Sequence, residues 1–301
     1  MSDSPKVLIL AGGGTGHLKP FIEAAQSLNA ALTVASFSDI EYITDGKLTV
    51  EGEDIANFDV LYIRLVGKRS EDAAFVVNYA KENGVRIVDT VYQTGDFVRL
   101  PLAKSIEARV LTKAGIPVPK TYFSSLENIT ENGESLLGFP FVIKGTMGKQ
   151  GKAVWSPRDH EELTRMIEVL IPRERAGERF IAQEFIEASQ RSRVFVVGDK
   201  ALGAITRPMR WRRRFINKVE GEFPEGKKEV IKDIPKEAEA MAVAAAKALG
   251  IDVAGVDLIK EDKSGKIYIM EVNSAPGWKS IKKDTGIDIE KEILKYLLSL
   301  K

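Results

Sequence analysis

A short apolar run that ends in a glycine-rich turn and leads into a helix constrains the fold of this chain most. Lys6–Leu10 is followed by the turn Ala11–Gly16, and apolar residues then recur at helical spacing from Pro20 to Leu28. Strand, glycine turn and helix form the first half of a βαβ unit. Further strands are expected at Leu32–Ser36, Val60–Ile63 and Arg86–Val88, with a helix over Glu71–Glu82. This alternation predicts a parallel, Rossmann-like sheet at the start of the chain.

After about residue 95, strands and helices no longer alternate regularly, which is typical of an α+β protein. A helix beginning near Leu100 is expected to stop at Gly115, because Pro117 and Pro119 cannot continue it. Strands are then expected at Phe139–Lys144, Ala153–Trp155, Phe180–Phe185 and Val194–Val197, and a helix at Glu161–Ile171. A hairpin turn at Gly198-Asp199, a helix over Pro235–Leu249, strands at Val253–Lys260 and Lys266–Asn273, and a final helix over Ile287–Leu300 complete the prediction.

Composition excludes several classes of protein. The 44 Lys and Arg residues nearly balance the 43 Asp and Glu residues, so the net charge of +1 gives no general reason to bind nucleic acid or a membrane. Cysteine is absent and the two histidines, His17 and His160, are far apart. Disulfides, Cys-ligated zinc and a Ser-His-Asp triad are therefore excluded. Without a signal peptide or an apolar run of about 20 residues, the chain is expected in the cytoplasm.

The hairpin near the C-terminus carries the strongest chemical signal. A turn centred on residue 264 would place Asp257 directly across from Glu271, and Asn273 would share their face because side chains alternate along a strand. Two adjacent carboxylates repel each other unless a cation lies between them. Oxygen ligands of this kind suit Mg²⁺. An exposed hairpin face is the alternative, but the apolar Met270 and Val272 on either side of Glu271 oppose it.

Two weaker motifs lie upstream. Lys144 ends an apolar strand and enters a loop with three glycines, Gly145, Gly148 and Gly151, which would let backbone N–H groups approach phosphate. The spacing is not that of a P-loop, and a plain surface turn explains the loop equally well. The segment Gln183–Ile186 closes a strand with acceptor and apolar groups that could hold an adenine.

These three features, in this order, resemble the ATP-grasp superfamily, and most closely its RimK-like glutamate ligase branch. The resemblance covers roughly residues 100–295 and is most specific over Asp252–Leu258, Met270–Gly277 and Thr285–Ile289. It implies an ATP-grasp fold, α/β and α+β, preceded by a Rossmann-like pre-ATP-grasp domain. The expected divisions are residues 1–98 for the first domain, 99–187 for the central subdomain and 188–301 for the C-terminal catalytic subdomain.

The resemblance also implies roles for individual residues. It assigns ATP binding to two lysines, two loop glycines and the adenine hinge: Lys104, Lys144, Gly148, Gly151, Gln183, Glu184, Phe185 and Ile186. It places Arg193 near the reacting phosphate, and Asn217 and Gly221 beside the active site. Asp257, Glu271 and Asn273 match the ligands of two Mg²⁺ ions, for which Mn²⁺ is the alternative.

Two positions depart from the family pattern. Relatives carry an Asp-x-Arg element whose aspartate lies close to the ribose, whereas Arg191 stands at that position here. This puts the usual ribose contact in doubt. The segment before Asn217 reads Arg-Trp-Arg-Arg-Arg-Phe-Ile over residues 210–216, so the arginine of the relatives' Phe-Arg-x-Asn pattern is shifted by one position.

The reaction implied is amide formation through an acyl phosphate, with ATP and Mg²⁺ as cofactors. The carboxylate and amine partners could be amino acids, other small molecules or an acidic peptide. The basic run Arg207–Arg214 could dock such a carboxylate, although a solvated loop explains it equally well. Relatives are commonly dimers or tetramers, so a homo-oligomer is expected.

Three other functions are alternatives to an amide-forming ligase. An ATP-grasp kinase would keep the fold and phosphorylate a hydroxyl. The turn over Ala11–Pro20 resembles the opening loop of MurG-type glycosyltransferases, although over ten residues only. The arginine run could also serve a non-catalytic nucleic-acid binder, which the neutral overall charge and the apparent metal ligands oppose.

Overall fold

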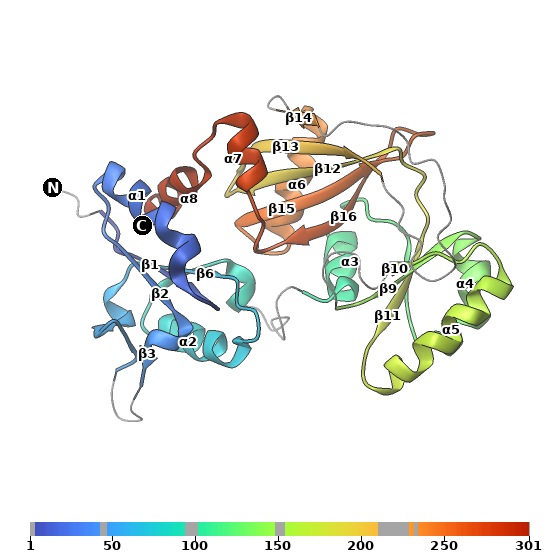
Figure 1. Cartoon of the computed structure of the whole chain (residues 1–301), viewed down its shortest axis with the longest axis horizontal. Coiled ribbons are helices and arrows are strands. Elements are labelled where there is room, and N and C mark those ends of the chain that lie inside the picture. The colour runs from blue at the N-terminus through green and yellow to red at the C-terminus, as the bar shows by residue number, and fades with distance from the viewer. Residues whose placement is uncertain are drawn as a thin grey trace.

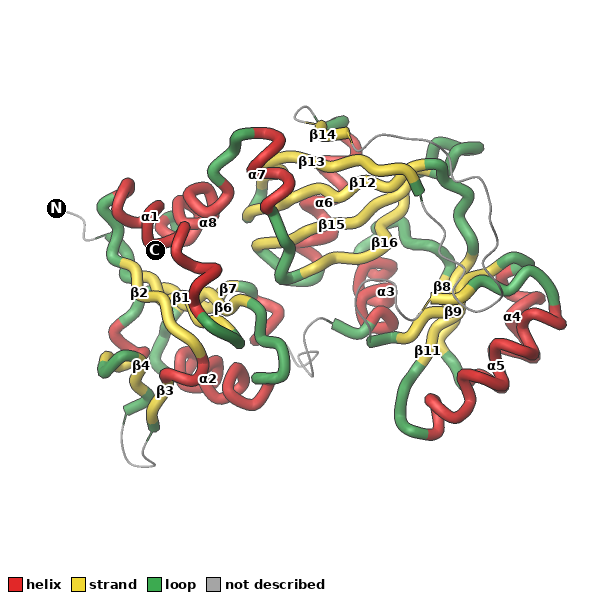
Figure 2. The backbone as a smooth tube through the Cα atoms, in the orientation of Figure 1, coloured by secondary structure: helices red, strands yellow, loops and turns green. Residues whose placement is uncertain are grey.

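The computed structural model describes residues 4–42, 47–93, 102–147, 154–209, 229–231 and 234–300. Figure 1 shows three groups of elements along the long axis of the molecule, and Figure 2 shows that each contains both helices and strands. Helix α3 (Lys104–Lys113) lies between the second and third groups. The mixed α/β and α+β architecture expected from the sequence is confirmed.

The first group is built on a parallel sheet in the order β2-β1-β6-β7. Its strands and helices are β1 (Val7–Ala11), β2 (Leu32–Ser36), β6 (Val60–Arg64), β7 (Arg86–Val88), α1 (Lys19–Leu28) and α2 (Ser70–Glu82). Leu8, Leu10 and Ile63 face α2, whereas Val7, Ile9 and Tyr62 face the opposite side with Phe21 of α1. Both faces are buried, which explains why these strands read as continuous apolar runs.

Shorter elements surround this sheet. A small antiparallel sheet and four 3₁₀ turns were not predicted: β3 (Ile40–Glu41), β4 (Thr49–Val50), β5 (Glu53–Asp54), η1 (Thr15–Leu18), η2 (Phe37–Asp39), η3 (Ile55–Asn57) and η4 (Thr90–Gln93). Strands of two residues leave too little alternation for a sequence pattern to reveal them.

The second group is an antiparallel sheet, in the order β10-β9-β11-β8, with helices on one face. It contains β8 (Thr121–Phe123), α4 (Leu126–Leu137), β9 (Phe141–Gly145), β10 (Val154–Trp155), α5 (His160–Arg175) and β11 (Phe180–Glu184). Phe141 and Phe180 pack against Leu163 and Leu126 of the two helices. Asp159 caps α5 by accepting a hydrogen bond from the backbone N of Glu162 at 2.8 Å.

The third group is a larger antiparallel sheet in the order β14-β13-β12-β15-β16. Its elements are β12 (Gln190–Val197), β13 (Lys200–Pro208), β14 (Glu229–Ile231), α6 (Lys236–Ala248), β15 (Val253–Lys260) and β16 (Ile267–Asn273). Val194, Val256 and Val272 on one face contribute to the same core cluster as Ala242 and Ala245 of α6. On the other face, Phe195 and Val253 belong to a second cluster that includes Ile281 of the later helix α7 (Lys279–Thr285).

The last two helices return toward the first group. They are α7 (Lys279–Thr285) and α8 (Ile289–Leu298), and α8 lies beside α1 at the left of Figure 1. Leu294 of α8 is fully buried against Ala24 and Ala25 of α1. The C-terminal helix therefore helps to cover the sheet formed by the N-terminal residues.

Candidate active site

One row of residues crosses three neighbouring strands of the third sheet. Arg193 on β12 is paired with Asp257 on β15, and Asp257 is paired with Glu271 on β16. The predicted pairing of Asp257 with Glu271 is therefore confirmed, and Asn273 pairs with Gly255 two residues along.

The register that aligns this row depends on a β-bulge. Lys260 pairs with Ile267 near the turn, which is offset by one residue from the pairing of Asp257 with Glu271. Met270 is the extra residue that makes up the difference. Bulges bend a strand and redirect its side chains, and they are common beside active sites.

Both carboxylates of the row contact cations. Arg193 donates from Nε and Nη2 to the two carboxylate oxygens of Asp257, each at 2.6 Å. This hydrogen bonding raises the pKa of Arg193 above its ordinary value. Lys104, at the start of α3, donates from Nζ to Oε1 of Glu271 at 3.3 Å. Arg193 and Lys104 thus converge on neighbouring acids, although they are 64 and 167 positions away in sequence from the acids that they contact.

The row offers oxygen ligands suited to a magnesium ion. Asp257 and Glu271 supply carboxylates, and the Asn273 amide lies on the same face, where its Nδ2 donates to the carbonyl of Gly255 at 3.4 Å. No group of three His, Cys, Asp or Glu side chains forms a metal cluster within the described ranges. Two carboxylates and an amide oxygen are a donor set that fits Mg²⁺, which is usually held by one or two carboxylates together with phosphate oxygens.

Glu107 is a functional candidate that the sequence reasoning missed. It lies one turn after Lys104 on α3, is 6% exposed, and accepts a hydrogen bond from the backbone N of Val272 at 2.6 Å. Burial, followed by the nearby Glu271 carboxylate, raises the pKa of Glu107 to about 8. The sequence does show that Glu107 shares a helix face with Lys104, because the two are three residues apart. It does not show that this face meets β16.

Lys144 approaches the same region from β9. Its Nζ donates to Oε1 of Gln183 at 2.6 Å, and Gln183 in turn donates from Nε2 to Oγ1 of Thr121 at 2.9 Å. Burial and the positive charge of Lys104 lower the pKa of Lys144 to about 8. The two lysines expected to bind phosphate are thus close enough to influence each other's charge.

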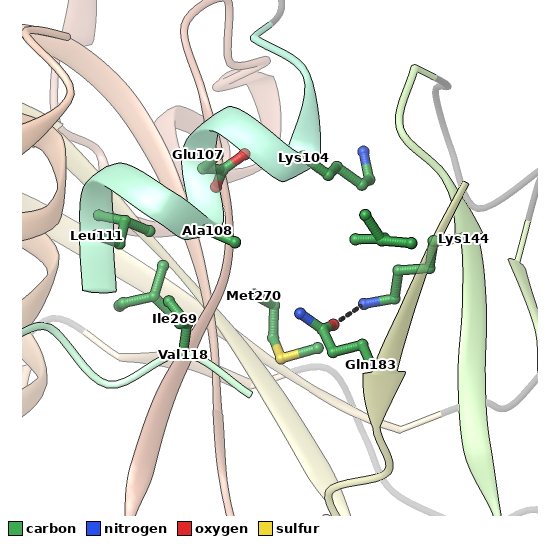
Figure 3. Close-up of a pocket in the computed structure, with 10 residues that line it drawn as sticks. Lys104, Glu107, Ala108, Leu111, Val118, Lys144, Gln183, Ile269 and Met270 are labelled. Carbon is green, nitrogen blue, oxygen red and sulfur yellow. Dashed lines mark hydrogen bonds between the residues drawn. The ribbon is translucent and has the colours of Figure 1, made fainter. Parts of the chain in front are cut away.

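A small pocket lies between α3, β9, β11 and β16. Figure 3 shows Lys104 and Glu107 projecting from α3, and Lys144 with Gln183 on the facing strands. The remaining lining is apolar: Ala108, Leu111, Val118, Ile181, Ile269 and Met270. An apolar pocket with a few convergent polar groups is the usual form of a small-molecule site.

The expected adenine hinge follows this pocket along β11. The Glu184 carboxylate accepts a hydrogen bond from the backbone N of Lys120 at 2.7 Å, and the backbone N of Glu184 donates to the Lys120 carbonyl at 2.9 Å. Phe185 is half-buried, and Ile186 is buried in a cluster that includes Met270. The Glu184 side chain is therefore held against the segment before β8.

Several expected site residues lie outside the described residues. These are Gly148, Gly151, Asn217, Gly221 and the part of the arginine run from Arg210 to Arg214. Two neighbouring arginines are described: Arg191 on β12 pairs directly with Arg207 on β13, and both are exposed. Because Arg191 and Arg193 are two residues apart on a strand, this pair lies on the face that carries Asp257.

The model of the RimK-like ATP-grasp domain matches residues 103–297. The chain belongs to this family. A probable alpha-L-glutamate ligase of Picosynechococcus is 30% identical over 258 residues, covering 82% of this chain and 78% of the relative. Relatives with the same name in Legionella pneumophila are 33% identical over 196 residues, 63% of this chain, and the chain spans 60% of their length.

Solved structures show the same ATP-grasp fold over nearly the whole chain. The ATP-grasp ligase PsnB, complexed with a minimal precursor, superposes with a TM-score of 0.73 at 16% identity, covering 99% of this chain and 100% of that one. The RimK domain protein of Sphaerobacter thermophilus gives 0.68 at 19% identity, covering 97% and 98%. The superposition includes the segment that carries the glycine turn after β1, so this turn is part of the shared fold. Within the described residues, every helix is too short or too polar to cross a membrane.

Proposed function

We propose that this protein is an ATP-dependent carboxylate–amine ligase that forms an amide bond through an acyl phosphate. The observation that carries the proposal is the row of Arg193, Asp257 and Glu271, next to the pocket that contains Lys104 and Lys144. Acids and cations converge there from α3, β9, β12, β15 and β16. Such an arrangement suits phosphoryl transfer, in which positioning and charge stabilisation supply most of the catalysis.

Each side chain of the site has a role in this proposal. Asp257, Glu271 and Asn273 would hold Mg²⁺, which would neutralise charge on the ATP phosphates so that a carboxylate can attack the γ-phosphorus, with ADP as the leaving group. Mn²⁺ is the alternative ion, and two ions are proposed. Lys104 and Lys144 would bind phosphate oxygens, and Arg193 would stabilise charge near the reacting phosphate.

The remaining nucleotide contacts are proposed for the hinge and the glycine loop. The backbone of Gln183–Ile186 would contact the adenine, with Met270 as part of an apolar floor. Gly148 and Gly151 would cover the phosphates, and Asn217 would act beside the reacting groups. The divisions 1–98, 99–187 and 188–301, a homo-oligomeric state and a cytoplasmic location complete the proposal.

An acidic substrate is favoured by Arg191 and Arg207. Like charges directly opposite each other on two strands repel, and an anion between them would relieve the repulsion. Peptide and amino-acid carboxylates are therefore the proposed substrate class, with an amine as the second substrate. Among the solved neighbours, PsnB and a RiPP-associated ligase of Chryseobacterium gregarium are complexed with precursor or with leader and core peptides.

The variant Glu271→Gln tests the proposal. Phosphate release is measured with ATP, Mg²⁺ and a panel of amino acids and acidic peptides, and products are identified by mass spectrometry. We expect the variant to lose several orders of magnitude in turnover because one metal-binding carboxylate is neutralised. Glu292→Gln on the exposed side of α8, where Glu292 pairs only with Lys295 among its described ion pairs, is the matched control.

Two outcomes would contradict the proposal. Near wild-type ATP consumption by Glu271→Gln, in the presence of an active substrate pair, would show that this carboxylate does not hold the metal. A phosphorylated product in place of an amide and free phosphate would indicate a kinase. The names of the relatives and neighbours, which are ligases, favour the amide.

A further inference from the structure

Arg64, the last residue of β6, is a buried cation with two hydrogen-bond donors that lack an acceptor among the described residues. The residue is 6% exposed, and its Nε and Nη1 have no hydrogen-bond partner among the described residues. Its Nη2 donates to the carbonyl of Pro276 at 3.3 Å, and its guanidinium lies 3.9 Å from the ring centre of Trp278. A buried guanidinium is costly unless its donors find acceptors, and an anion would satisfy them.

Burial opposes ionisation of the acidic groups that interact with Arg64. Asp89 is fully buried, and burial together with the neighbouring Asp252 carboxylate raises the pKa of Asp89 well above its ordinary value. Burial also raises the pKa of Tyr62, on the same strand, to about 12. In both groups burial opposes the ionised form that would balance the positive charge of Arg64.

Arg64 lies where the topology of the first sheet favours a ligand. The order β2-β1-β6-β7 means that the chain leaves β1 toward one side of the sheet and continues from β6 toward the other. In parallel α/β sheets, ligands bind outside the carboxyl ends of the strands at this switch point. Ala11 and Arg64, the last residues of β1 and β6, are paired there.

The two loops that leave the switch point are packed closely and carry only positive charge. Gly12 donates from its backbone N to the carbonyl of Leu65 at 3.1 Å, and a Cβ at Gly12 would lie 2.2 Å from that oxygen. Leu65 adopts φ +54°, a strained value for a residue with a branched side chain. The segments 11–20 and 64–70 contain Lys19, Arg64, Lys68 and Arg69 but no carboxylate.

Pro276, which accepts a hydrogen bond from Arg64, also connects the switch point to the strand that carries Asp257. A Cβ at Gly255 would lie 2.8 Å from Cβ of Pro276, so the Pro276 ring packs over the position paired with Asn273. A group bound at Arg64 would thus lie next to the loop that follows the proposed metal ligands.

We propose that Arg64 and the loop Gly12–Gly14 form an anion site for the carboxylate substrate, holding a carboxylate group other than the one that reacts. The anion takes the free donors of Arg64 and replaces its long contact with Pro276. Gly13 and Gly14 are exposed with open space around them, so their backbone can approach the ligand. This inference rests on the proposed ligase function and defines the substrate as one with at least two acidic groups.

Thermal unfolding with glutarate, a dicarboxylate without an amine, tests the site. Glutarate is expected to raise the midpoint temperature of the wild type, to raise that of Arg64→Lys less, and to leave that of Arg64→Met unchanged. Glutaramide, the uncharged diamide, is expected to have no effect on any of them. Arg69→Met removes an exposed cation of the same loop that is already paired with Asp72 at 3.7 Å, so it is the matched control and should keep the response.

Thermal unfolding without ligand distinguishes an anion site from a purely structural role of Arg64 as a clamp on Pro276 and Trp278. Removing an unpaired buried charge should leave Arg64→Met at least as stable as the wild type, whereas a clamp on Pro276 and Trp278 predicts a loss of several degrees. That loss, no response of the wild type to glutarate, or an equal response of Arg64→Met would each overturn the inference. The shift caused by a non-hydrolysable ATP analogue with Mg²⁺ should be equal in all variants. Its absence would count against the proposed ligase function alone, because the glutarate response is measured without nucleotide.

Discussion

At the scale of single residues, Glu107 links the helix that carries Lys104 to the strand that carries Glu271. β16 is at the edge of its sheet, so the backbone N of Val272 has no strand partner on that side. The Glu107 carboxyl group accepts its hydrogen bond, and Pro117 accepts one from Ile269 on the same edge at 2.9 Å. The edge strand that presents Glu271 is thus held by contacts from outside the sheet.

Substitutions at Glu107 should separate its hydrogen bond from its charge. Glu107→Ala leaves a buried N–H without an acceptor, and we expect the free energy of unfolding to fall by about 1–3 kcal/mol. Glu107→Gln keeps an oxygen at the same place and resembles the protonated acid, which the pKa of about 8 favours near pH 7. Urea unfolding should therefore place Glu107→Gln close to the wild type. Equal losses in both variants would show that the negative charge, and not the acceptor, stabilises β16.

At the scale of elements, α8 depends on a partner from the other end of the chain. Leu294 is fully buried against α1, and truncation to Ala would leave a cavity. We expect Leu294→Ala to lower the free energy of unfolding by about 2–5 kcal/mol. Ile22→Ala is the control, because Ile22 lies on α1 but is 45% exposed, and a surface change of this kind costs about 0.5 kcal/mol or less. Similar losses in both variants would mean that α8 does not pack on α1 as described.

Individual strands and helices could be predicted from the sequence, whereas the contacts between elements far apart in the chain could not. The hairpin Val253–Asn273 was predictable because one turn brings its two strands together, so the pairing of Asp257 with Glu271 needed no long-range information. The bulge at Met270 did not follow, since it shifts the register by one residue without a glycine or proline to mark it. The contacts of α3 with β16 join residues 165 and 167 positions apart, and periodicity carries no signal at that separation.

At the scale of the whole molecule, Asp89 joins the first sheet to the third. It follows β7, and its Oδ1 accepts hydrogen bonds from the backbone N of Asp252 at 2.8 Å and of Val253 at 3.1 Å. Val91 donates to the carbonyl of Gly250 at 2.9 Å beside it. Asp252 also accepts a hydrogen bond from Tyr296 of α8 at 3.0 Å, so three parts of the chain meet at this point.

This junction should make stability depend on pH. Burial, and then the charge of Asp252, raise the pKa of Asp89 above its ordinary value of 3.8, so the folded protein binds this proton more tightly than the unfolded chain. The stabilisation from proton binding is complete below about pH 4 and declines as pH rises toward the folded pKa, by up to about 1.4 kcal/mol per pH unit. Asp89→Asn keeps the acceptor oxygen but cannot ionise.

Urea unfolding of the wild type and Asp89→Asn across pH 4–8 measures this effect, because contributions from other carboxylates cancel in the difference. We expect the stability of the wild type to fall relative to that of Asp89→Asn as pH rises. Asp59→Asn is a suitable control, since Asp59 accepts a hydrogen bond from the exposed backbone N of Lys6. A wild type that gains stability over Asp89→Asn with rising pH would mean that the ionised carboxylate is the favoured form. The contact between the two sheets would then depend on its charge.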